Sequence, residues 1–397
     1  MSQSDHARPH RRRMLQGAGG LALAGLGGCA TEPVGGIGGT ARPAGYISLA
    51  PVRASPDRIF DVTVCLRPFR AEGPRLDAEQ VGDKLVVHNY GHGGSGWSLS
   101  WGSATVALEK AMTASPAEIA VIGCGAIGLT SAILAQRAGA KVTIYAKEYL
   151  PETRSVRATG SFTPDSRIAL ASKVAAGFPA LWERMTRISF KAYRAYLGLP
   201  GSPVEWNDRY IVADTQTEGG GELPGSLDFA DYSERILDLQ APSTPLPPGS
   251  TPFRNARVRR YSSMMFNIAD YGHTLLTDFL LAGGRIQRTE FHAPSELAAL
   301  PQKVVIDCTG YGARALWRDD SIVPVRGQIA WLIPQPEVDY GVIYEDVNML
   351  SRRDGIVLQM LEGGDMRGYG DDNETPDHAE ALTAVARIAA LYARFAA

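Results

Sequence analysis

The chain has 397 residues, 45% of them hydrophobic, so it can bury a large core and is long enough for two domains. Its 40 lysine and arginine residues nearly balance its 42 aspartate and glutamate residues, so no charge excess indicates nucleic acid or an anionic membrane as a partner. Four cysteines are too few for a disulfide framework in a chain of this length.

Residues 1–40 are predicted to be a targeting segment rather than part of the fold. Arg11-Arg12-Arg13-Met14-Leu15-Gln16 resembles a twin-arginine export signal, and the glycine-rich run 17–28 is too short to span a membrane. Leu26-Gly27-Gly28-Cys29 resembles the lipobox of bacterial lipoproteins. The alternatives are a disordered basic tail and an incidental cysteine. We therefore expect export to the periplasm or cell envelope, with membrane contact only through a lipid on Cys29.

A glycine-rich loop between a strand and a helix follows the predicted linker of residues 41–56. The first strands are predicted at 59–66, running into Arg67-Pro68-Phe69-Arg70, and at 85–90. The loop Gly91-His92-Gly93-Gly94-Ser95-Gly96 then leads into a helix predicted at 97–112. Such a junction leaves unpaired N–H groups at the helix start, which suit an anion.

A second strand, glycine turn and helix follow within about 30 residues, the pattern of a dinucleotide-binding βαβ unit. Residues 119–122 and 141–145 read as buried strands, and 127–137 as the helix between them. Gly123 permits the tight turn, Gly125 lets the backbone approach a pyrophosphate, and Gly128 lets helix and strand pack closely. The motif alone does not choose between FAD and NAD.

The rest of the chain alternates helices and strands. Helices are predicted at 166–176, 178–197, 268–282 and about 378–395, strands at 204–212, 284–289 and 304–307, and a long loop at 223–251. Residues 328–333, 341–348 and 354–360 are predicted to form antiparallel strands of a substrate domain.

Several stretches between residues 58 and 360 resemble the D-amino-acid oxidase family. The run from His88 to Gly102 resembles its flavin-binding signature, and Arg67-Pro68-Phe69-Arg70 its preceding arginine segment. Further resemblances lie at 145–148, 153–155, Gly160, 304–310 and 325–329. The resemblance implies an α/β fold, with a Rossmann-type FAD-binding domain and an antiparallel-sheet substrate domain.

The order of these stretches differs from that of the family. In the family, the arginine and histidine–glycine motifs follow the substrate domain, whereas here they precede the first Rossmann strand. The chain therefore resembles a circular permutant, with 113–118 as the new connection and the C-terminal helix ending near residue 57. An alternative is that 45–112 pair with another chain by swapping. We expect an FAD-binding domain of 57–165 plus about 260–325, and a substrate domain of 166–259 plus about 326–397.

The resemblance implies FAD as the cofactor and indicates which residues bind it. Backbone N–H groups of Gly94 to Ser98 suit the negative charge of the reduced ring. Glu148 suits the ribose hydroxyls, next to Lys147, which stands where the family has an acidic residue; Arg154 suits the pyrophosphate. For Glu148 and Arg154 the alternatives are an exposed strand-end charge and a solvated loop arginine. The predicted cofactor-binding residues are Gly93, Gly94, Ser95, Gly96, Trp97, Ser98, Gly123, Gly125, Ala126, Ile127, Gly128, Lys147, Glu148, Thr153, Arg154, Ser155, Gly160, Ser161, Thr309 and Gly310.

The implied chemistry is hydride transfer from a substrate α-carbon to flavin N5. Arg67 suits the substrate carboxylate, since its guanidinium binds two oxygens, with a structural ion pair as the alternative. The Gly94 carbonyl would accept a hydrogen bond from the amine. Tyr344 falls where the family has a mobile active-site tyrosine, and Asn348 where it has a second, carboxylate-binding tyrosine. Because asparagine is shorter, Asn348 puts an ordinary D-amino acid in doubt.

We therefore expect an enzyme that oxidises the C–N bond of a D-amino acid to an imino acid, then an oxo acid and ammonia, with oxygen as acceptor. The alternatives are an oxidase or dehydrogenase of glycine, sarcosine or other N-substituted amino acids, a non-catalytic FAD-binding protein, and an NAD-dependent dehydrogenase. His88 and His92 lack partners at metal-ligand spacing and are predicted to be structural. Cys65, Cys124 and Cys308 are predicted to be buried, and Trp97 and Trp101 to lie in the core.

Overall fold

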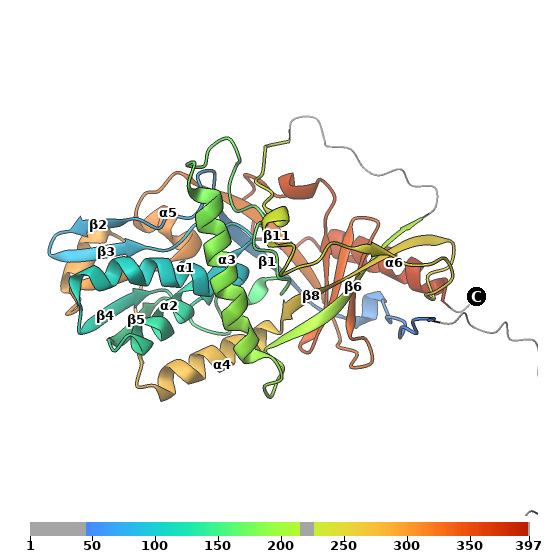
Figure 1. Cartoon of the computed structure of the whole chain (residues 1–397), viewed down its shortest axis with the longest axis horizontal. Coiled ribbons are helices and arrows are strands. Elements are labelled where there is room, and N and C mark those ends of the chain that lie inside the picture. The colour runs from blue at the N-terminus through green and yellow to red at the C-terminus, as the bar shows by residue number, and fades with distance from the viewer. Residues whose placement is uncertain (1–44, 215–225, 396–397) are drawn as a thin grey trace, which may run out of the picture. The chain divides into compact units, whose positions relative to one another are not determined.

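A computed structural model describes residues 45–214 and 226–395 (Figure 1). The predicted export signal, Cys29 and the first residues of the linker lie outside the described residues, as do 223–225 of the predicted long loop. Within the described ranges, no helix has the length and apolar character needed to cross a bilayer.

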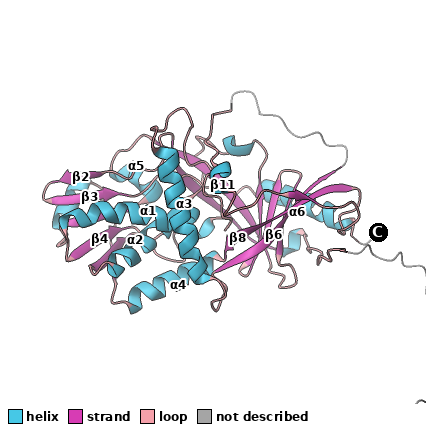
Figure 2. Ribbon diagram, viewed as in Figure 1, coloured by secondary structure: helices cyan, strands magenta, loops and turns pink. Residues whose placement is uncertain are grey.

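A six-stranded sheet carries both glycine-rich turns (Figure 2). Five of its strands are parallel, and β2 pairs antiparallel with β3 at one edge. In spatial order the strands are β2 (Ala78–Val81), β3 (Lys84–His88), β10 (Val304–Asp307), β4 (Glu118–Ile122), β5 (Lys141–Ala146) and β9 (Arg285–Arg288). The predicted βαβ unit is thus present as β4, α2 and β5, and β10 lies between the two strands that precede glycine turns.

Three helices cover one face of this sheet: α1 (Gly96–Ala111), α2 (Ala126–Arg137) and α4 (Ile268–Leu281) (Figure 1). Alternate strand residues such as Val87 and Val121 pack into this helical core, while Val86 and Ala120 face the opposite side, beneath Leu297 and Leu300. Helix α3 (Phe178–Tyr193) packs across α1. A short helix, α5 (Ala313–Leu316), follows β10.

The second sheet has eight strands, in the order β1 (Ile59–Arg70), β11 (Ile322–Leu332), β14 (Gly355–Met360), β13 (Val347–Arg352), β12 (Tyr340–Tyr344), β6 (Val204–Asp214), β8 (Ala256–Phe266) and β7 (Thr244–Pro245). Its pairs are antiparallel except for β12 and β6, which run parallel, so the predicted antiparallel sheet is mixed. Helix α6 (His378–Ala393) covers one face.

The two faces of this sheet have different contents. Tyr340, Val342 and Tyr344 of β12 point into the core beneath α6, together with Val347 and Met349 of β13. Because strand side chains alternate, neighbouring positions point the other way. We call this opposite side the cavity face; it carries Cys65 and Arg67 of β1, Arg209 of β6 and Asn348 of β13.

Three expectations are corrected. Residues 341–348 form two strands rather than one, because Glu345 and Asp346 adopt positive φ angles of 43° and 59° in a tight turn. Residues 166–176 form turns instead of a helix, since their backbone bonds go elsewhere, for example from Leu170 N–H to Ala71 O. The strand at 59–66, expected in the FAD-binding domain, belongs to the eight-stranded sheet because β1 pairs along its length with β11.

Candidate active site

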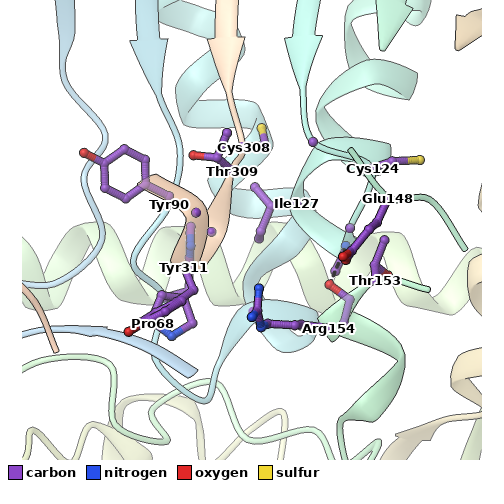
Figure 3. Close-up of a pocket in the computed structure, with 18 of the residues that line it drawn as sticks. Pro68, Tyr90, Cys124, Ile127, Glu148, Thr153, Arg154, Cys308, Thr309 and Tyr311 are labelled. Atoms are coloured by element: carbon purple, nitrogen blue, oxygen red, sulfur yellow. Dashed lines mark hydrogen bonds between the residues drawn. The ribbon is translucent and has the colours of Figure 1, made fainter. Parts of the chain in front are cut away.

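A cavity of about 540 Å³ opens at the carboxyl ends of the parallel strands (Figure 3). Both glycine turns line it, the first with 91–94 and Gly96, the second with 122–127. We call it the glycine-lined cavity. The expected convergence of two helix starts on one cleft is therefore confirmed, at the sheet edge where α/β proteins bind ligands.

The second turn leaves room for glycine alone. Gly123 has a φ of +101°, and a Cβ there would lie 2.5 Å from the Cys308 carbonyl oxygen. A Cβ at Gly128 would collide with the Gly123 carbonyl, and one at Gly125 would lie 2.6 Å from Ser155 Oγ. Gly128 packs helix against strand and does not itself line the cavity. The geometry matches the tight turn expected at Gly123 and the close helix–strand packing expected at Gly128; the role of Gly125 beside a pyrophosphate stays a prediction.

The first turn differs from expectation in its free N–H groups. Gly93 has a φ of +55°, and a Cβ there would collide with the Arg167 carbonyl. Gly94 N–H donates to Ser166 O at 3.0 Å, and Ser95 N–H to His92 O at 2.9 Å. The N–H groups that α1 offers to a ligand therefore begin at Gly96, not at Gly94. Ser95 and Ser98 are not lining residues, although Gly96 and Trp97 are.

Ser155 joins the two helix starts. Its hydroxyl accepts a hydrogen bond from the Ala126 N–H at 3.1 Å, at the first residue of α2. Its carbonyl accepts one from the Trp97 indole at 2.7 Å, near the start of α1. Ser155, in the segment that follows β5, thus holds both turns in place relative to each other.

The end of β5 supplies one acidic and two basic candidates. Glu148 lines the cavity close to Thr153 in Figure 3. Lys147 also lines it, but its ammonium pairs with Glu290 at 2.8 Å. Arg154 pairs with Glu374 at 2.5 Å and lies 5.6 Å over the Tyr311 ring. Of the three, Glu148 is therefore the residue whose side chain forms no ion pair within 4.0 Å among the described residues.

The lining residues fit FAD. The hydroxyls of Thr153 and Thr289 are buried, line the cavity and have no hydrogen-bond partner in the described chain. A buried polar atom without a partner is uncommon, and a bound polyol or phosphate would satisfy both. Together with two helix N-termini and glycine clearance, these hydroxyls make the site suited to a dinucleotide.

Arg67 extends from β1 toward the glycine-lined cavity, which it lines. Its Nη1 donates to the Arg326 carbonyl at 3.2 Å, and its guanidinium lies against Gly327, where a Cβ would collide with it. Among the described residues, no carboxylate lies within 4.0 Å of it. Arg167 lies close by, and burial together with the charge of Arg67 lowers the pKa of Arg167 to about 10. The alternative interpretation of Arg67, as part of a structural ion pair, is therefore not supported among the described residues.

The structure corrects the prediction that Tyr344 lies in the active site. It is buried beneath α6, and its hydroxyl bonds to Arg394 at 2.7 Å, Glu345 at 2.9 Å and Asp214 at 3.2 Å. Its burial raises the pKa of the phenol. The register of β12 directs its side chain away from the cavity face, so it does not meet Arg67.

The other predicted residues divide by location. Thr309 and Gly310 line the cavity after β10, and Thr309 donates from Oγ1 to Asp307 at 2.7 Å. Gly160 and Ser161 do not line it; a Cβ at Gly160 would lie 2.5 Å from the Phe266 carbonyl oxygen. Asn348 is on the cavity face, outside the glycine-lined cavity, and accepts a hydrogen bond from Arg209 at 3.3 Å.

Sequence reasoning missed several lining residues, among them Tyr90, Tyr311 and the segment 289–292. A signal for the last was available, because 284–289 was predicted as a strand. Because this strand, β9, runs parallel to β5, its carboxyl end lies at the same edge of the sheet as Glu148. Tyr311 follows Gly310 by one residue, yet nothing in the local pattern shows that its ring turns toward Arg154.

Both histidines of the first loop are buried in hydrogen-bonded positions. His88 lies between Asp307, at 3.0 Å, and Glu79, at 2.6 Å. His92 Nε2 is 2.6 Å from Ser103 Oγ, and burial lowers the pKa of His92 to about 3. Burial raises the pKa of the Cys124 thiol to about 12. His88, at the end of β3, and His92 are therefore held in place beside the first turn, whereas Cys124 is a buried thiol of the second turn.

Comparisons with known proteins show the family of the chain. A family model described as FAD dependent oxidoreductase matches residues 118–397. A D-amino-acid oxidase of Streptomyces coelicolor is 27% identical over 233 residues, covering 58% of this chain and 63% of its own length. One from Dictyostelium discoideum is 58% identical over 53 residues, or 13% of this chain and 15% of its own. The chain thus matches less than two thirds of the length of these relatives.

The solved structure of iminodiacetate oxidase from Chelativorans sp. BNC1 is similar with a TM-score of 0.47 and 15% identity. The match covers 70% of this chain and 80% of that one.

Proposed function

We propose, from the premise that this chain belongs to the family of FAD-dependent oxidoreductases, that it oxidises the C–N bond of a D-amino acid. FAD is its cofactor. The observation that carries the substrate class is Arg67, a guanidinium at the edge of the glycine-lined cavity with no carboxylate partner among the described residues. A bidentate cation in that position suits the carboxylate of an amino acid.

Residues of this chain would bind the substrate and orient it. Arg67 holds the carboxylate, and the Gly94 carbonyl accepts a hydrogen bond from the amine, so the α-hydrogen faces the cavity. The start of α1, from Gly96 onward, stabilises negative charge beside it. Bound FAD would supply the acceptor, at N5, for the α-hydrogen as hydride. The amine loses a proton as the C=N bond forms, water hydrolyses the imine to an oxo acid and ammonia, and oxygen, the proposed acceptor, is reduced to hydrogen peroxide.

Two alternatives remain proposals of lower rank. Glycine, sarcosine or another N-substituted amino acid is favoured by the family alone, whereas a non-catalytic FAD-binding protein is favoured by Asn348 in place of a tyrosine. Anaerobic mixing of the purified flavoprotein with glycine, sarcosine, D-proline and D-alanine separates them. Loss of the oxidised-flavin band near about 450 nm identifies the substrates. A band that no D-amino acid bleaches contradicts the proposed function.

We also propose that the chain is a circular permutant of its family. The family match begins at residue 118, the first residue of β4, while β1, β3 and α1 precede it. The two ends of the described chain meet at the Tyr340 hydroxyl, which lies 2.5 Å from Ala50 O and 2.9 Å from the Tyr392 hydroxyl. A variant chain with residues 45–112 rejoined after residue 395 should fold and bind FAD. An unfolded or colourless product contradicts the proposal.

Export through the twin-arginine pathway, with Cys29 acylated in the cell envelope, is a further proposal that rests on residues 11–29 alone. Replacing Arg12 and Arg13 together by lysine should hold the protein in the cytoplasm. Labelling with a radioactive fatty acid should mark the native protein and not Cys29→Ser. An unlabelled native protein would leave export intact and exclude the lipid.

A further inference from the structure

Gly327 occupies a strand position whose backbone does not itself require glycine. It is buried in β11, opposite Cys65 of β1, and its φ lies outside the left-handed region. A residue with a side chain could adopt the same backbone conformation, and glycine inside a strand weakens that strand. The need for glycine at this position therefore lies in the space around it.

The guanidinium of Arg67 fills the space over Gly327. A Cβ at Gly327 would collide with the Nη1, Cζ and Nη2 atoms of that group. The direct partner of Arg67 across the strand pair is Val325, so Gly327 is its diagonal neighbour, which a long side chain can reach. Nη1 also donates to the Arg326 carbonyl at 3.2 Å. We call the backbone of Arg326 and Gly327 the arginine seat.

The arginine seat is held from both sides. Leu66 and Cys65 of β1 pair in register with Arg326 and Gly327. On the other side, the Arg326 N–H donates to the Gly368 carbonyl at 2.9 Å, and a Cβ at Gly368 would collide with the Arg326 carbonyl. The strand therefore has little room to move, whereas the guanidinium is the far end of a flexible side chain. A methyl group added at Gly327 would displace the guanidinium and leave the strand in place.

A second cavity, of about 580 Å³, borders the arginine seat and contains acidic residues, but these do not hold Arg67. Glu380 pairs with Arg367 at 2.7 Å. Asp371 and Asp377 each accept a hydrogen bond from a backbone N–H at 2.9 Å. None of these three carboxylates forms an ion pair with Arg67 within 4.0 Å. Contact with the seat, and not an ion pair, therefore sets the direction of the Arg67 guanidinium.

The seat leaves one edge of the guanidinium free. Nη1 is engaged by the Arg326 carbonyl, whereas Nε and Nη2 donate no hydrogen bond within the described chain. Arg75 uses this same edge to bind the Asp77 carboxylate, at 2.8 Å from Nε and 3.2 Å from Nη2. Two parallel bonds of this kind fix the orientation of a carboxylate as well as its position. The seat thus presents Arg67 in a state that suits a bidentate ligand.

We propose that Gly327 is a positioning residue for the substrate-binding arginine, because its missing side chain lets the arginine seat hold Arg67 with Nε and Nη2 free for the α-carboxylate. This inference rests on the proposed function, in which Arg67 binds the substrate. Gly327 acts through Arg67 and not on the substrate itself. With a methyl group at this position, the guanidinium leaves the seat, keeps its charge and loses its fixed orientation.

Gly327→Ala in the holoprotein tests the seat, with acetate as the carboxylate ligand. Acetate has no amine to oxidise, so its Kd can be measured from the change that it causes in the absorption of the oxidised flavin. We expect this Kd, and KM for the D-amino acid that the wild type oxidises fastest, to rise by about tenfold or more, the usual effect of losing a charge-assisted bond. The change in kcat should be smaller than the change in KM. An unchanged Kd and KM overturn the proposal.

Flavin content and thermal stability show whether the side chain or the strand has moved. The flavin content of Gly327→Ala should equal that of the wild type, and Tm should stay within about 3 °C, because only the end of a flexible side chain is displaced. Loss of flavin, a larger fall in Tm or failure to fold would mean that the strand itself moves, and each overturns the proposal.

A double-mutant cycle with Arg67→Ala tests whether Gly327 acts through the arginine. In the Arg67→Ala background, Gly327→Ala should change kcat/KM by no more than about twofold, since no guanidinium is left to displace. The same tenfold loss in both backgrounds would indicate a merely structural role and overturn the proposal. Gly177→Ala is the matched control, because nothing lies within 4 Å of a Cβ there, and it should leave kcat/KM within about twofold.

These measurements separate the failure of this inference from that of the proposed function. If the wild type oxidises D-amino acids and Gly327→Ala binds acetate as tightly as the wild type does, the inference fails and the proposed function stands. If no D-amino acid is oxidised, the proposed function fails, and the acetate titration alone decides whether Gly327 positions Arg67 for a carboxylate.

Discussion

The two sheets contribute to the site by different means. The six-stranded sheet offers backbone: two helix starts, kept bare by glycines at which an added Cβ would meet another carbonyl. The eight-stranded sheet offers side chains, such as Arg67 and Asn348, whose direction depends on strand register. The backbone part should therefore fail abruptly when one atom is added, whereas the side-chain part should lose function by degrees.

The largest effect is expected from Gly128→Ala. Its Cβ would collide with the Gly123 carbonyl, forcing α2 away from β4 at a cost on the order of 3 kcal/mol or more. The Kd for FAD should rise on the order of 100-fold, or the protein should lose its flavin on purification. Gly177→Ala is the control, because nothing lies within 4 Å of a Cβ there. Full flavin content in Gly128→Ala would contradict a backbone-built site.

Arg67→Ala tests the side-chain part. It should raise KM and lower kcat/KM for amino acids by about tenfold to a thousandfold, the loss of one charge-assisted clamp, while FAD stays bound. The control is Arg53→Ala. Arg53 precedes Arg67 in the chain, is exposed, and pairs with Glu337 at 2.9 Å. Unchanged kinetics on carboxylate substrates would show that Arg67 is not the clamp.

A pH effect is expected from the loop that supports the first glycine turn. Burial lowers the pKa of His92 to about 3 from 6.5, so below pH 6.5 the unfolded chain gains a proton that the folded chain refuses. The contribution of His92 to the free energy of unfolding should therefore fall by about 1.4 kcal/mol per pH unit as pH drops from 6.5 to 3. Burial also raises the pKa of Asp165 to about 6, which gives the opposite slope between pH 3.8 and 6.

Urea unfolding of wild type and His92→Gln at several pH values isolates the histidine, since both proteins share Asp165. Between pH 3.8 and 6 the free energy of unfolding of the wild type should change little with pH, because the contributions of His92 and Asp165 offset each other. That of the variant should rise by about 1.4 kcal/mol per unit as pH falls. Parallel curves would mean that His92 is protonated in the folded protein.

The smallest effect is expected from Tyr344→Phe, which removes a hydroxyl on the α6 side of the sheet. Activity should stay within about twofold, while the free energy of unfolding should fall by about 1 kcal/mol through the lost bonds to Arg394 and Asp214. A large loss of kcat with unchanged stability would put Tyr344 back in the active site and reverse the assignment of faces.

The sequence was sufficient for the βαβ unit of the six-stranded sheet because its signals are local. Each glycine of the 123–128 turn has its role set by residues within about 30 positions, and Glu148 follows directly from the end of β5. The shared cavity of the two turns was predictable from the family resemblance. The lining segment at 289–292 was not, because its position depends on β9 pairing with β5 across 140 residues of chain.

The eight-stranded sheet was less predictable for the same reason. Tyr344 and Asn348 are four residues apart, so a single strand over 341–348 would place them on one face. The turn at Glu345 and Asp346 splits that strand, and the two side chains end on opposite faces. Arg209 carries no local signal of its partners, because its hydrogen bonds reach Asn348 of β13 and Ser161, both distant in the chain.

The pairing of β1 with β11 has a consequence for how the chain folds. Ile59 meets Leu332, and β3 likewise waits for β10, so the earliest strands to leave the ribosome find their neighbours only after more than half of the chain has been made. Such high contact order slows folding and leaves strand edges open to aggregation during synthesis. Neither sheet can be completed by its N-terminal strands alone, and the binding cleft therefore forms only after β10 and β11 have been made.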